Sequence, residues 1–181
     1  MTQDENVKPA VVVRDAGESD MPAVQRIYAH YVLTSLATFE ETPPSVDVML
    51  TRRRSAVDNG APYLVAEADG DVVGYAYAVA YHARSAYRFT VEDSVYVAEG
   101  MHNRGVGSAL LRVLVERCEA GPWRQMVAVV GDSANAGSIG LHRRFGFELV
   151  GVLTSVGYKF GRWIDTPILQ RALGKGAGPA A

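Results

Sequence analysis

Residues 95–108 read VYVAEGMHNRGVGS, and this stretch joins two different local patterns. The β-branched and aromatic residues of 89–97 are typical of a strand, whereas an apolar stripe at helical spacing begins at Val106. Between the two patterns, Gly105 and Gly107 occupy alternate positions. Glycine lets the main chain approach an anion closely, and the free amide hydrogens of a helix start bind phosphate. The stretch predicts a strand-to-helix turn that binds a phosphate, although a turn without a ligand would use the same glycines.

The segments on either side of this turn predict an alternating α/β chain. Helices are expected after Ser19 and after Ser45, both good N-cap residues, and over 106–118 and 138–145. The Asp69–Gly70 pair is a strong hairpin signal. Strands are expected at 11–13, 63–68, 72–81, 89–97, 125–130, 148–158 and 163–173. The order predicts a mixed α/β sheet with helices on both of its faces.

Length and composition predict one domain with short tails. The chain has 181 residues, of which 48% are hydrophobic and 21% are charged, and its formal net charge is −2. These values argue against a disordered chain and against a global basic field that would hold nucleic acid. We expect a domain at 10–173 between flexible tails at 1–9 and 174–181.

The same composition limits where the protein works and what it binds. An acidic start, no apolar run of roughly 20 residues and a single cysteine, Cys118, predict a reduced, cytoplasmic protein without a membrane segment. The four histidines show no zinc spacing, so no metal is expected.

The turn and its surroundings resemble the GCN5-related N-acetyltransferases (GNAT). Their loop has the pattern Gln/Arg-x-x-Gly-x-Gly/Ala, which Gly105 and Gly107 match, while His102 departs from it. The resemblance implies a single GNAT-type α/β (α+β) domain with a mixed, mostly antiparallel sheet of about seven strands. It also implies acetyl-CoA as the acetyl donor. The contacts that it implies for acetyl-CoA are Val95, Tyr96, Val97, His102, Asn103, Arg104, Gly105, Val106, Gly107, Ser108, Asn135 and Ser138.

Longer segments resemble one subgroup, the phosphinothricin and methionine sulfoximine acetyltransferases. They are Ala37–Glu40, Ala83–Tyr87, Phe89–Val97, Val156–Trp163 and the Leu-His-x-x-x-Gly pattern around His142. In this subgroup the Thr-Val-Glu glutamate, here Glu92, is the proposed general base, and the helix histidine, here His142, is proposed to assist proton transfer. A main-chain N–H near Val95 or Tyr96 would hold the oxyanion. Without the resemblance, Glu92 and His142 would be interpreted as surface residues.

The resemblance implies a small α-amino acid substrate with a phosphorus or sulfur group on its side chain. Arg84 is the first choice for binding the α-carboxylate, because a guanidinium can donate two hydrogen bonds to it. The other expected substrate contacts are Phe39, His82, Tyr87, Arg88 and Lys159, with Trp163 as a further apolar wall. Phe39 and Trp163 could equally be core residues.

The predicted activity is acetyl transfer from acetyl-CoA to the α-amino group of phosphinothricin or of methionine sulfoximine or sulfone, by direct attack in a ternary complex. An activity of this kind can confer resistance to a herbicide or antibiotic. The alternatives are an acetyltransferase of the same fold for another amine or a protein N-terminus, and a non-catalytic acyl-CoA-binding module. A homodimer is also implied by the subgroup.

Overall fold

The computed structural model describes residues 10–178, which form seven strands and four α-helices. The strands are β1 (Val12–Asp15), β2 (Tyr63–Ala68), β3 (Asp71–Ala80), β4 (Thr90–Val97), β5 (Gln125–Val129), β6 (Glu148–Lys159) and β7 (Arg162–Ala172). The α-helices are α1 (Met21–Thr34), α2 (Val46–Asp58), α3 (Val106–Glu119) and α4 (Ala136–Arg144). Two short 3₁₀ turns lie at Glu18–Asp20 and Ser85–Tyr87.

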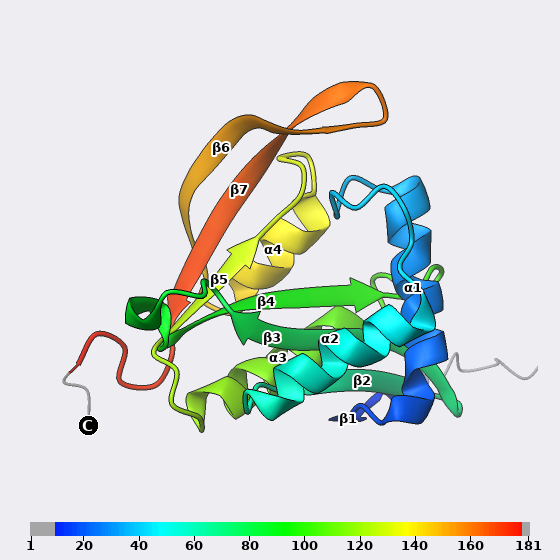
Figure 1. The fold of residues 1–181 in the computed structure, drawn as a ribbon, viewed down its shortest axis with the longest axis horizontal. Coiled ribbons are helices and arrows are strands. Elements are labelled where there is room, and N and C mark those ends of the chain that lie inside the picture. The colour runs from blue at the N-terminus through cyan, green and yellow to red at the C-terminus, as the bar shows by residue number, and fades with distance from the viewer. Residues whose placement is uncertain (1–9, 179–181) are drawn as a thin grey trace, which may run out of the picture.

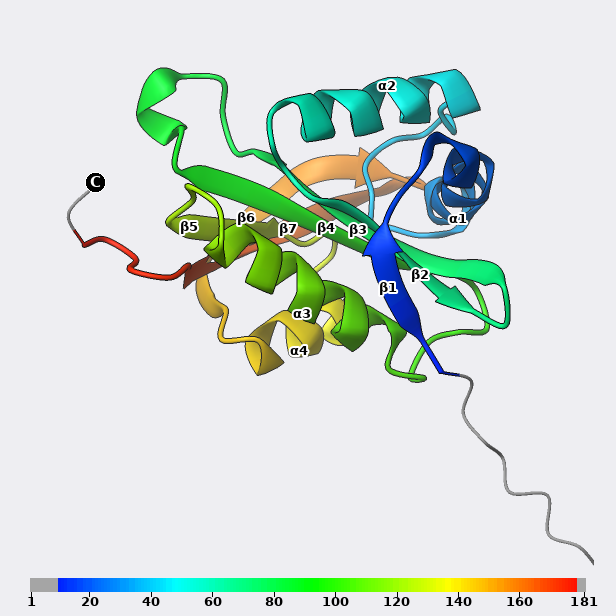
Figure 2. The ribbon, with the colours of Figure 1, turned by 90° about the horizontal axis from the view of Figure 1, so that it is seen from below.

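All seven strands belong to one sheet in the order β1-β2-β3-β4-β5-β7-β6. Every neighbouring pair is antiparallel except β4 and β5, which run parallel. Helices α1 and α2 cover one face, and α3 and α4 cover the other (Figure 2). The fold class predicted from the sequence is therefore confirmed, including the mostly antiparallel sheet.

The predicted element boundaries differ from the observed ones by a few residues at most. Ser45 caps α2 as expected, because its hydroxyl accepts a hydrogen bond from the Val48 amide. The predicted cap Ser19 is wrong: Asp20 is the N-cap of α1, and Pro22 lies in the first turn, where a missing N–H costs nothing. Helix α4 begins at Ala136, two residues earlier than predicted, and Asn135 is its N-cap.

The core lies between the sheet and its two helix layers. On the α3 side, Leu110, Leu114 and Cys118 are fully buried. On the α1 side, the rings of Tyr63 and Tyr75 stack with that of Tyr77 in a layer beneath the helices. These two layers fix the helices against the sheet and thus the positions of the helix ends around β4 and β5.

The predicted tails at the two chain ends can be compared with the residues that the structure describes. The predicted tail at 1–9 lies outside the described residues, as do residues 179–181. Residues 174–178 form turns closed by main-chain hydrogen bonds, from the Gly176 amide to Leu173 and from the Gly178 amide to Lys175. The flexibility expected of residues 174–181 stays a prediction.

Candidate functional site

The two central strands pair over only part of their length. The parallel ladder joins Thr90–Asp93 to residues 125–128 and then stops, while β4 continues to Val97. Figure 1 shows β5, β7 and β6 rising away from the plane of β4 and β3. Beyond Asp93 the edge of β4 that faces β5 therefore has no strand paired to it.

Main-chain direction shows which residues of β4 face this gap. The Ala98 amide donates to the Val73 carbonyl of the β3 side at 2.9 Å, and successive residues of a strand point to alternate edges. Val95 and Val97 therefore present their N–H and C=O groups to the gap, and Tyr96 presents its own to β3. The predicted main-chain contact of Tyr96 with a ligand is wrong for this reason, and Val95 is the better source of an oxyanion donor.

A residue that the sequence did not indicate occupies part of this edge. The Tyr31 hydroxyl of α1 donates to the Val97 carbonyl at 2.8 Å and accepts from the Val97 amide at 3.3 Å. The phenol thus takes the place of a neighbouring strand at Val97 and leaves Val95 open. Only the tertiary packing of α1 brings Tyr31 here, so no local pattern could have indicated it.

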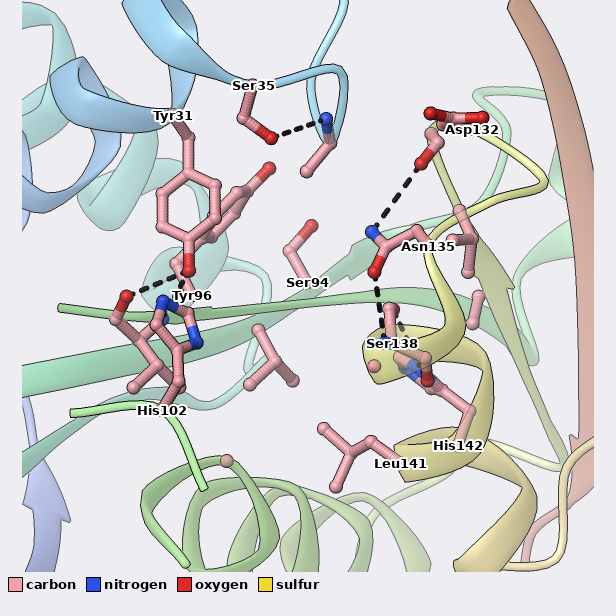
Figure 3. Close-up of a pocket in the computed structure, with 18 of the residues that line it drawn as sticks. Tyr31, Ser35, Ser94, Tyr96, His102, Asp132, Asn135, Ser138, Leu141 and His142 are labelled. Atoms are coloured by element: carbon pink, nitrogen blue, oxygen red, sulfur yellow. Dashed lines mark hydrogen bonds between the residues drawn. The ribbon is translucent and has the colours of Figure 1, made fainter. Parts of the chain in front are cut away.

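The gap opens into a cavity of about 790 Å³. Most of the residues predicted to contact acetyl-CoA line it, together with His142: Val95, Tyr96, Val97, His102, Asn103, Gly105, Val106, Gly107, Ser108, Asn135 and Ser138. Figure 3 shows Tyr31, Tyr96 and His102 on one wall and Asn135, Ser138 and His142 on the facing wall. Arg104 is exposed and is not part of the lining.

The start of α3 forms the floor of this cavity. Gly105 has a φ of +88°, a left-handed conformation that glycine adopts without strain, and it turns the chain directly into the helix. No side chain caps this N-terminus, so the first amides of α3 keep free hydrogens. Because a helix dipole adds partial positive charge at the same place, the turn is suited to a diphosphate.

Asn135 and Ser138 enter the cavity from the start of α4. The Asn135 side-chain oxygen accepts from the Ser138 amide at 3.1 Å and so caps the helix. The Asn135 side-chain Nδ2 group donates to the Gly131 carbonyl at 3.5 Å, a long hydrogen bond that a ligand could replace. Asn135 therefore orders the α4 start that carries Ser138.

Glu92 lies beside the cavity rather than in its wall. It is half-buried on the α1 side of β4, two residues before the lining residue Ser94, a spacing of roughly 7 Å along a strand. Burial, and then the neighbouring Asp93 carboxylate, raise the pKa of Glu92 above its usual 4.5. A raised pKa brings a carboxylate closer to the range in which it accepts protons from an ammonium group.

His142 lies on the opposite face of the sheet, because its partner Asp93 alternates with Glu92 along β4. Its Nε2 is 2.9 Å from Asp93 Oδ2, and its Nδ1 is 2.8 Å from the Ser138 carbonyl oxygen. Burial lowers the pKa of His142, but the charge and hydrogen bond of Asp93 outweigh it, so that the pKa is raised overall. The two residues expected to take part in proton transfer, Glu92 and His142, thus lie on opposite faces of the sheet.

Four of the expected substrate contacts gather in the loop between β3 and β4, among them Arg84, the first choice for the α-carboxylate. His82, Arg84, Tyr87 and Arg88 are all exposed there. The His82 ring packs on Tyr87, and the Arg88 guanidinium lies over the Phe89 ring at 4.5 Å. The Arg84 carbonyl accepts from the Tyr87 amide at 2.9 Å, but the Arg84 guanidinium has no hydrogen bond or ion pair within residues 10–178 and remains available to a ligand. None of these four residues lines the cavity.

Lys159 is buried beside the α1–α2 loop. It is 2% exposed, and its ammonium donates to the Ser35 carbonyl at 2.9 Å and the Thr38 carbonyl at 2.8 Å. These two carbonyls hold its charge against the α1–α2 loop, which argues against the predicted contact of Lys159 with substrate, and that contact stays a prediction. Removal from water lowers the pKa of Lys159.

Phe39 and Trp163, for which two interpretations stood open, are not core residues. Phe39 is 41% exposed and rests on Gly157 of β6, where an added Cβ would come within 2.4 Å of its ring. Trp163 is exposed and packs against Tyr158 at the end of the β6–β7 hairpin. Phe39 therefore remains a candidate apolar contact beside the α1–α2 loop.

Residues 10–178 contain neither a metal-binding cluster nor a membrane-spanning helix. No cluster of His, Cys, Asp or Glu in this range could hold a metal ion. Within the same range, no helix combines the length and the apolar character that crossing a bilayer requires.

The open edge of β4 and the uncapped start of α3 form a site that suits a ligand with an amide-containing arm and a diphosphate, and comparison with known proteins gives the family. The family model described as an acetyltransferase (GNAT) domain matches residues 13–168. This protein belongs to the GNAT acetyltransferases.

Three similar proteins share nearly the whole chain. A phosphinothricin N-acetyltransferase of Alcaligenes faecalis is 56% identical over 92% of this chain and 85% of its own. An L-methionine sulfoximine/L-methionine sulfone acetyltransferase of Pseudomonas aeruginosa is 43% identical over 87% of this chain and 92% of its own. The crystal structure of a phosphinothricin acetyltransferase from Sinorhizobium meliloti, in complex with acetyl-CoA, has a TM-score of 0.91 and 48% identity, covering 93% of this chain and 91% of its own.

Proposed function

We propose that this enzyme transfers acetyl from acetyl-CoA to the α-amino group of phosphinothricin or of methionine sulfoximine or sulfone. The observation that carries the proposal is the 56% identity to a phosphinothricin N-acetyltransferase over 92% of the chain. The cavity supports it, since its open strand edge can pair with an amide-containing arm and its helix start can bind a diphosphate.

The residues supply separate parts of the reaction. Val95 and the start of α3 bind acetyl-CoA and place its thioester in the gap between β4 and β5. Glu92 accepts a proton from the substrate ammonium group, directly or through water, so that the amine can attack. The Val95 amide stabilises the oxyanion that forms. Direct attack of the amine on the thioester is favoured over a covalent relay through Cys118. This thiol is fully buried, and burial raises its pKa to about 12. It is therefore neutral, and a neutral thiol is a poor nucleophile.

The test is release of CoA thiol from acetyl-CoA in the presence of a panel of amines. Turnover is expected with phosphinothricin, methionine sulfoximine and methionine sulfone. Turnover only with a peptide N-terminus would assign the enzyme to the alternative substrate class. Binding of acetyl-CoA without any turnover would favour an acyl-CoA-binding module instead.

Replacing Arg84 with Ala tests how the amino acid is oriented. We expect the KM for the amino acid to rise by about 10- to 100-fold, the worth of a charge-assisted bidentate contact of about 1.5–3 kcal/mol. The KM for acetyl-CoA should not change, because Arg84 lies outside the cavity. Arg26→Ala, at an exposed position on α1, is the control. If Arg84→Ala has the wild-type KM for the amino acid, another cation binds the α-carboxylate.

We also propose that the enzyme is a cytoplasmic homodimer that confers resistance to such substrates. The β6–β7 hairpin exposes the large apolar residues Val150, Tyr158 and Trp163, and β6 is a sheet edge. Contiguous apolar surface of this kind favours association with a second copy. Sedimentation should give twice the chain mass of 19.5 kDa, and Trp163→Ser should weaken the dimer. A monomer at micromolar concentration would contradict the assembly.

A further inference from the structure

Tyr31 closes one of the two main-chain pairing sites that β4 presents to the cavity. Its hydroxyl donates to the Val97 carbonyl at 2.8 Å and accepts from the Val97 amide at 3.3 Å. Burial raises the pKa of Tyr31, so the phenol keeps the hydrogen that it donates. Both groups of Val97 that face the gap are therefore engaged, whereas the same edge of β4 is open at Val95.

The Tyr31 ring is held by its neighbours. Its centroid lies 5.1 Å from that of the Tyr96 ring and 6.4 Å from that of the His102 ring, both in edge-on contacts. Figure 3 shows the three side chains together on one wall of the cavity. The phenol comes from the last turn of α1, which ends at Thr34. A ring that is packed on two sides and fixed to a helix keeps its hydroxyl at Val97.

Val97 lies next to the start of α3. A Cβ built on Gly107 would lie 3.6 Å from Val97 Cγ2. An arm that extends from a diphosphate at this helix start therefore meets Val97 first and Val95 next, two residues or roughly 7 Å further along the strand. The gap then ends at Asp93, which is already paired with β5, and Glu92 precedes Asp93. The acetyl group must reach the Val95 amide, the proposed oxyanion donor, to come near Glu92.

The arm of CoA could pair with this edge in more than one register. It carries two amide groups, and each can form hydrogen bonds with a strand edge as a peptide group does. In the productive register, the amide next to the thioester donates to the Val95 carbonyl. Val97 offers the same pair of groups one repeat earlier. An arm paired there would leave the acetyl group roughly 7 Å short of its place near Glu92, and coenzyme in this short register could not react.

We propose that Tyr31 is a positioning residue that fixes the register of acetyl-CoA along β4. By engaging the N–H and C=O groups of Val97, the phenol leaves Val95 as the pairing site for the amide next to the thioester. The short register is thereby excluded, and the acetyl group is directed to the Val95 amide. Tyr31 takes no part in making or breaking bonds. This role rests on the proposed function, which supplies acetyl-CoA as the donor.

Hydrogen exchange of the main-chain amides, followed by NMR without any amine present, measures the pairing directly. The Ala98 amide, which donates to the Val73 carbonyl at 2.9 Å, is the internal reference for the exchange rates. In the wild type, acetyl-CoA should slow exchange of the Val95 amide about two- to tenfold relative to Ala98, the effect of a typical hydrogen bond. Exchange of the Val97 amide relative to Ala98 should not change.

The same measurement on Tyr31→Phe tests the phenol itself, because the ring stays packed while Val97 becomes open. The Val97 amide should exchange faster than in the wild type, and acetyl-CoA should now slow it. Tyr158→Phe, which removes a hydroxyl from an exposed ring of β6, is the control and should behave as the wild type. If acetyl-CoA protects the Val97 amide of the wild type, coenzyme displaces the phenol and the role of Tyr31 is overturned.

Calorimetry and steady-state kinetics give the consequence for the reaction. In Tyr31→Phe, a second way of binding should lower the Kd for acetyl-CoA about two- to tenfold. With whichever amine of the panel the wild type acetylates, kcat should fall by about two- to tenfold as well. The kcat/KM for acetyl-CoA should not fall, since the short register occupies the site without changing the productive path.

Two kinetic results would overturn the role in fixing the register. A lower kcat/KM for acetyl-CoA in Tyr31→Phe would make Tyr31 a binding residue or a support for the cavity wall. Tighter binding of acetyl-CoA at unchanged kcat would mean that the phenol only competes with the coenzyme.

The outcomes for Tyr31 and for the proposed function are distinguishable. If the wild type does not bind acetyl-CoA, both fail. If it binds acetyl-CoA but acetylates no amine of the panel, the proposed function fails, and hydrogen exchange still decides whether Tyr31 keeps the coenzyme from Val97. If the amines are acetylated and acetyl-CoA protects the Val97 amide of the wild type, only the role of Tyr31 fails.

Discussion

Glu92→Gln should lower kcat by about 10²- to 10⁴-fold, the range for loss of a positioned general base. The amide keeps the shape of the carboxyl group but cannot accept a proton from an ammonium group. The wild-type rate should rise with pH through the raised pKa of Glu92, above its usual 4.5, because only the ionised form is a base. This rise should be absent from the variant. Initial rates of thiol release between pH 5 and 9 measure both effects.

The free energy of unfolding of Glu92→Gln distinguishes loss of the general base from misfolding of the variant. A carboxyl group whose pKa is raised by folding favours the native state below its unfolded pKa, and this contribution disappears as the pH rises through the folded value. The ionised Glu92 is therefore a cost at neutral pH, and Gln should leave the free energy of unfolding unchanged or higher. Glu116→Gln, on the exposed face of α3, is the matched control. A variant that is stable and fully active would transfer the role of base to water or to another group.

Lys159→Met should destabilise the protein by about 2–4 kcal/mol, because each buried carbonyl left without a donor costs about 1–3 kcal/mol. Methionine has a similar length but cannot donate to Ser35 and Thr38. The α1–α2 loop also lines the cavity at Ser35, Leu36 and Ala37, so its displacement should lower kcat/KM by as much as about 10²-fold. Urea denaturation and steady-state kinetics measure the two effects.

The control for this substitution is Lys175→Met, which removes the same charge from an exposed lysine. It should change neither the stability nor kcat/KM. Wild-type stability in Lys159→Met would mean that water replaces the ammonium group at both carbonyls. Loss of activity at wild-type stability would instead place Lys159 in contact with substrate, as the sequence suggested.

The stretch from Val95 to Ser108 illustrates what local pattern predicts well. Strand and helix periodicities, a left-handed glycine and free amides are properties of neighbouring residues, so the turn at Gly105 and its place beside the strand could be predicted. The resemblance to a known family indicated Asn135 and Glu92 as site residues. In the structure Asn135 lines the cavity and Glu92 lies beside it. Their catalytic and binding roles stay predictions until the variants are measured.

Contacts between residues far apart in the sequence could not be predicted from local pattern or from the resemblance. Tyr31 and Val97 are 66 positions apart, and His142 and Asp93 are 49 apart, so no periodicity relates them. Lys159 reaches carbonyls more than 120 positions away. A lysine near an expected substrate site favours a ligand contact, whereas in the structure its ammonium group donates to main-chain oxygens of the α1–α2 loop.

The amino-acid order alone determined the α/β class and the strand-to-helix turn, because both depend on backbone preferences and side-chain periodicity within a few residues, whereas the acid beside the turn came from the resemblance to a known family. Only the tertiary structure decided that Glu92 and His142 lie on opposite faces of the sheet, and that the edge of β4 is open at Val95. The physical reason is that the divergence of β4 from β5, and the helices packed around it, determine which polar groups find partners and which remain free for a ligand.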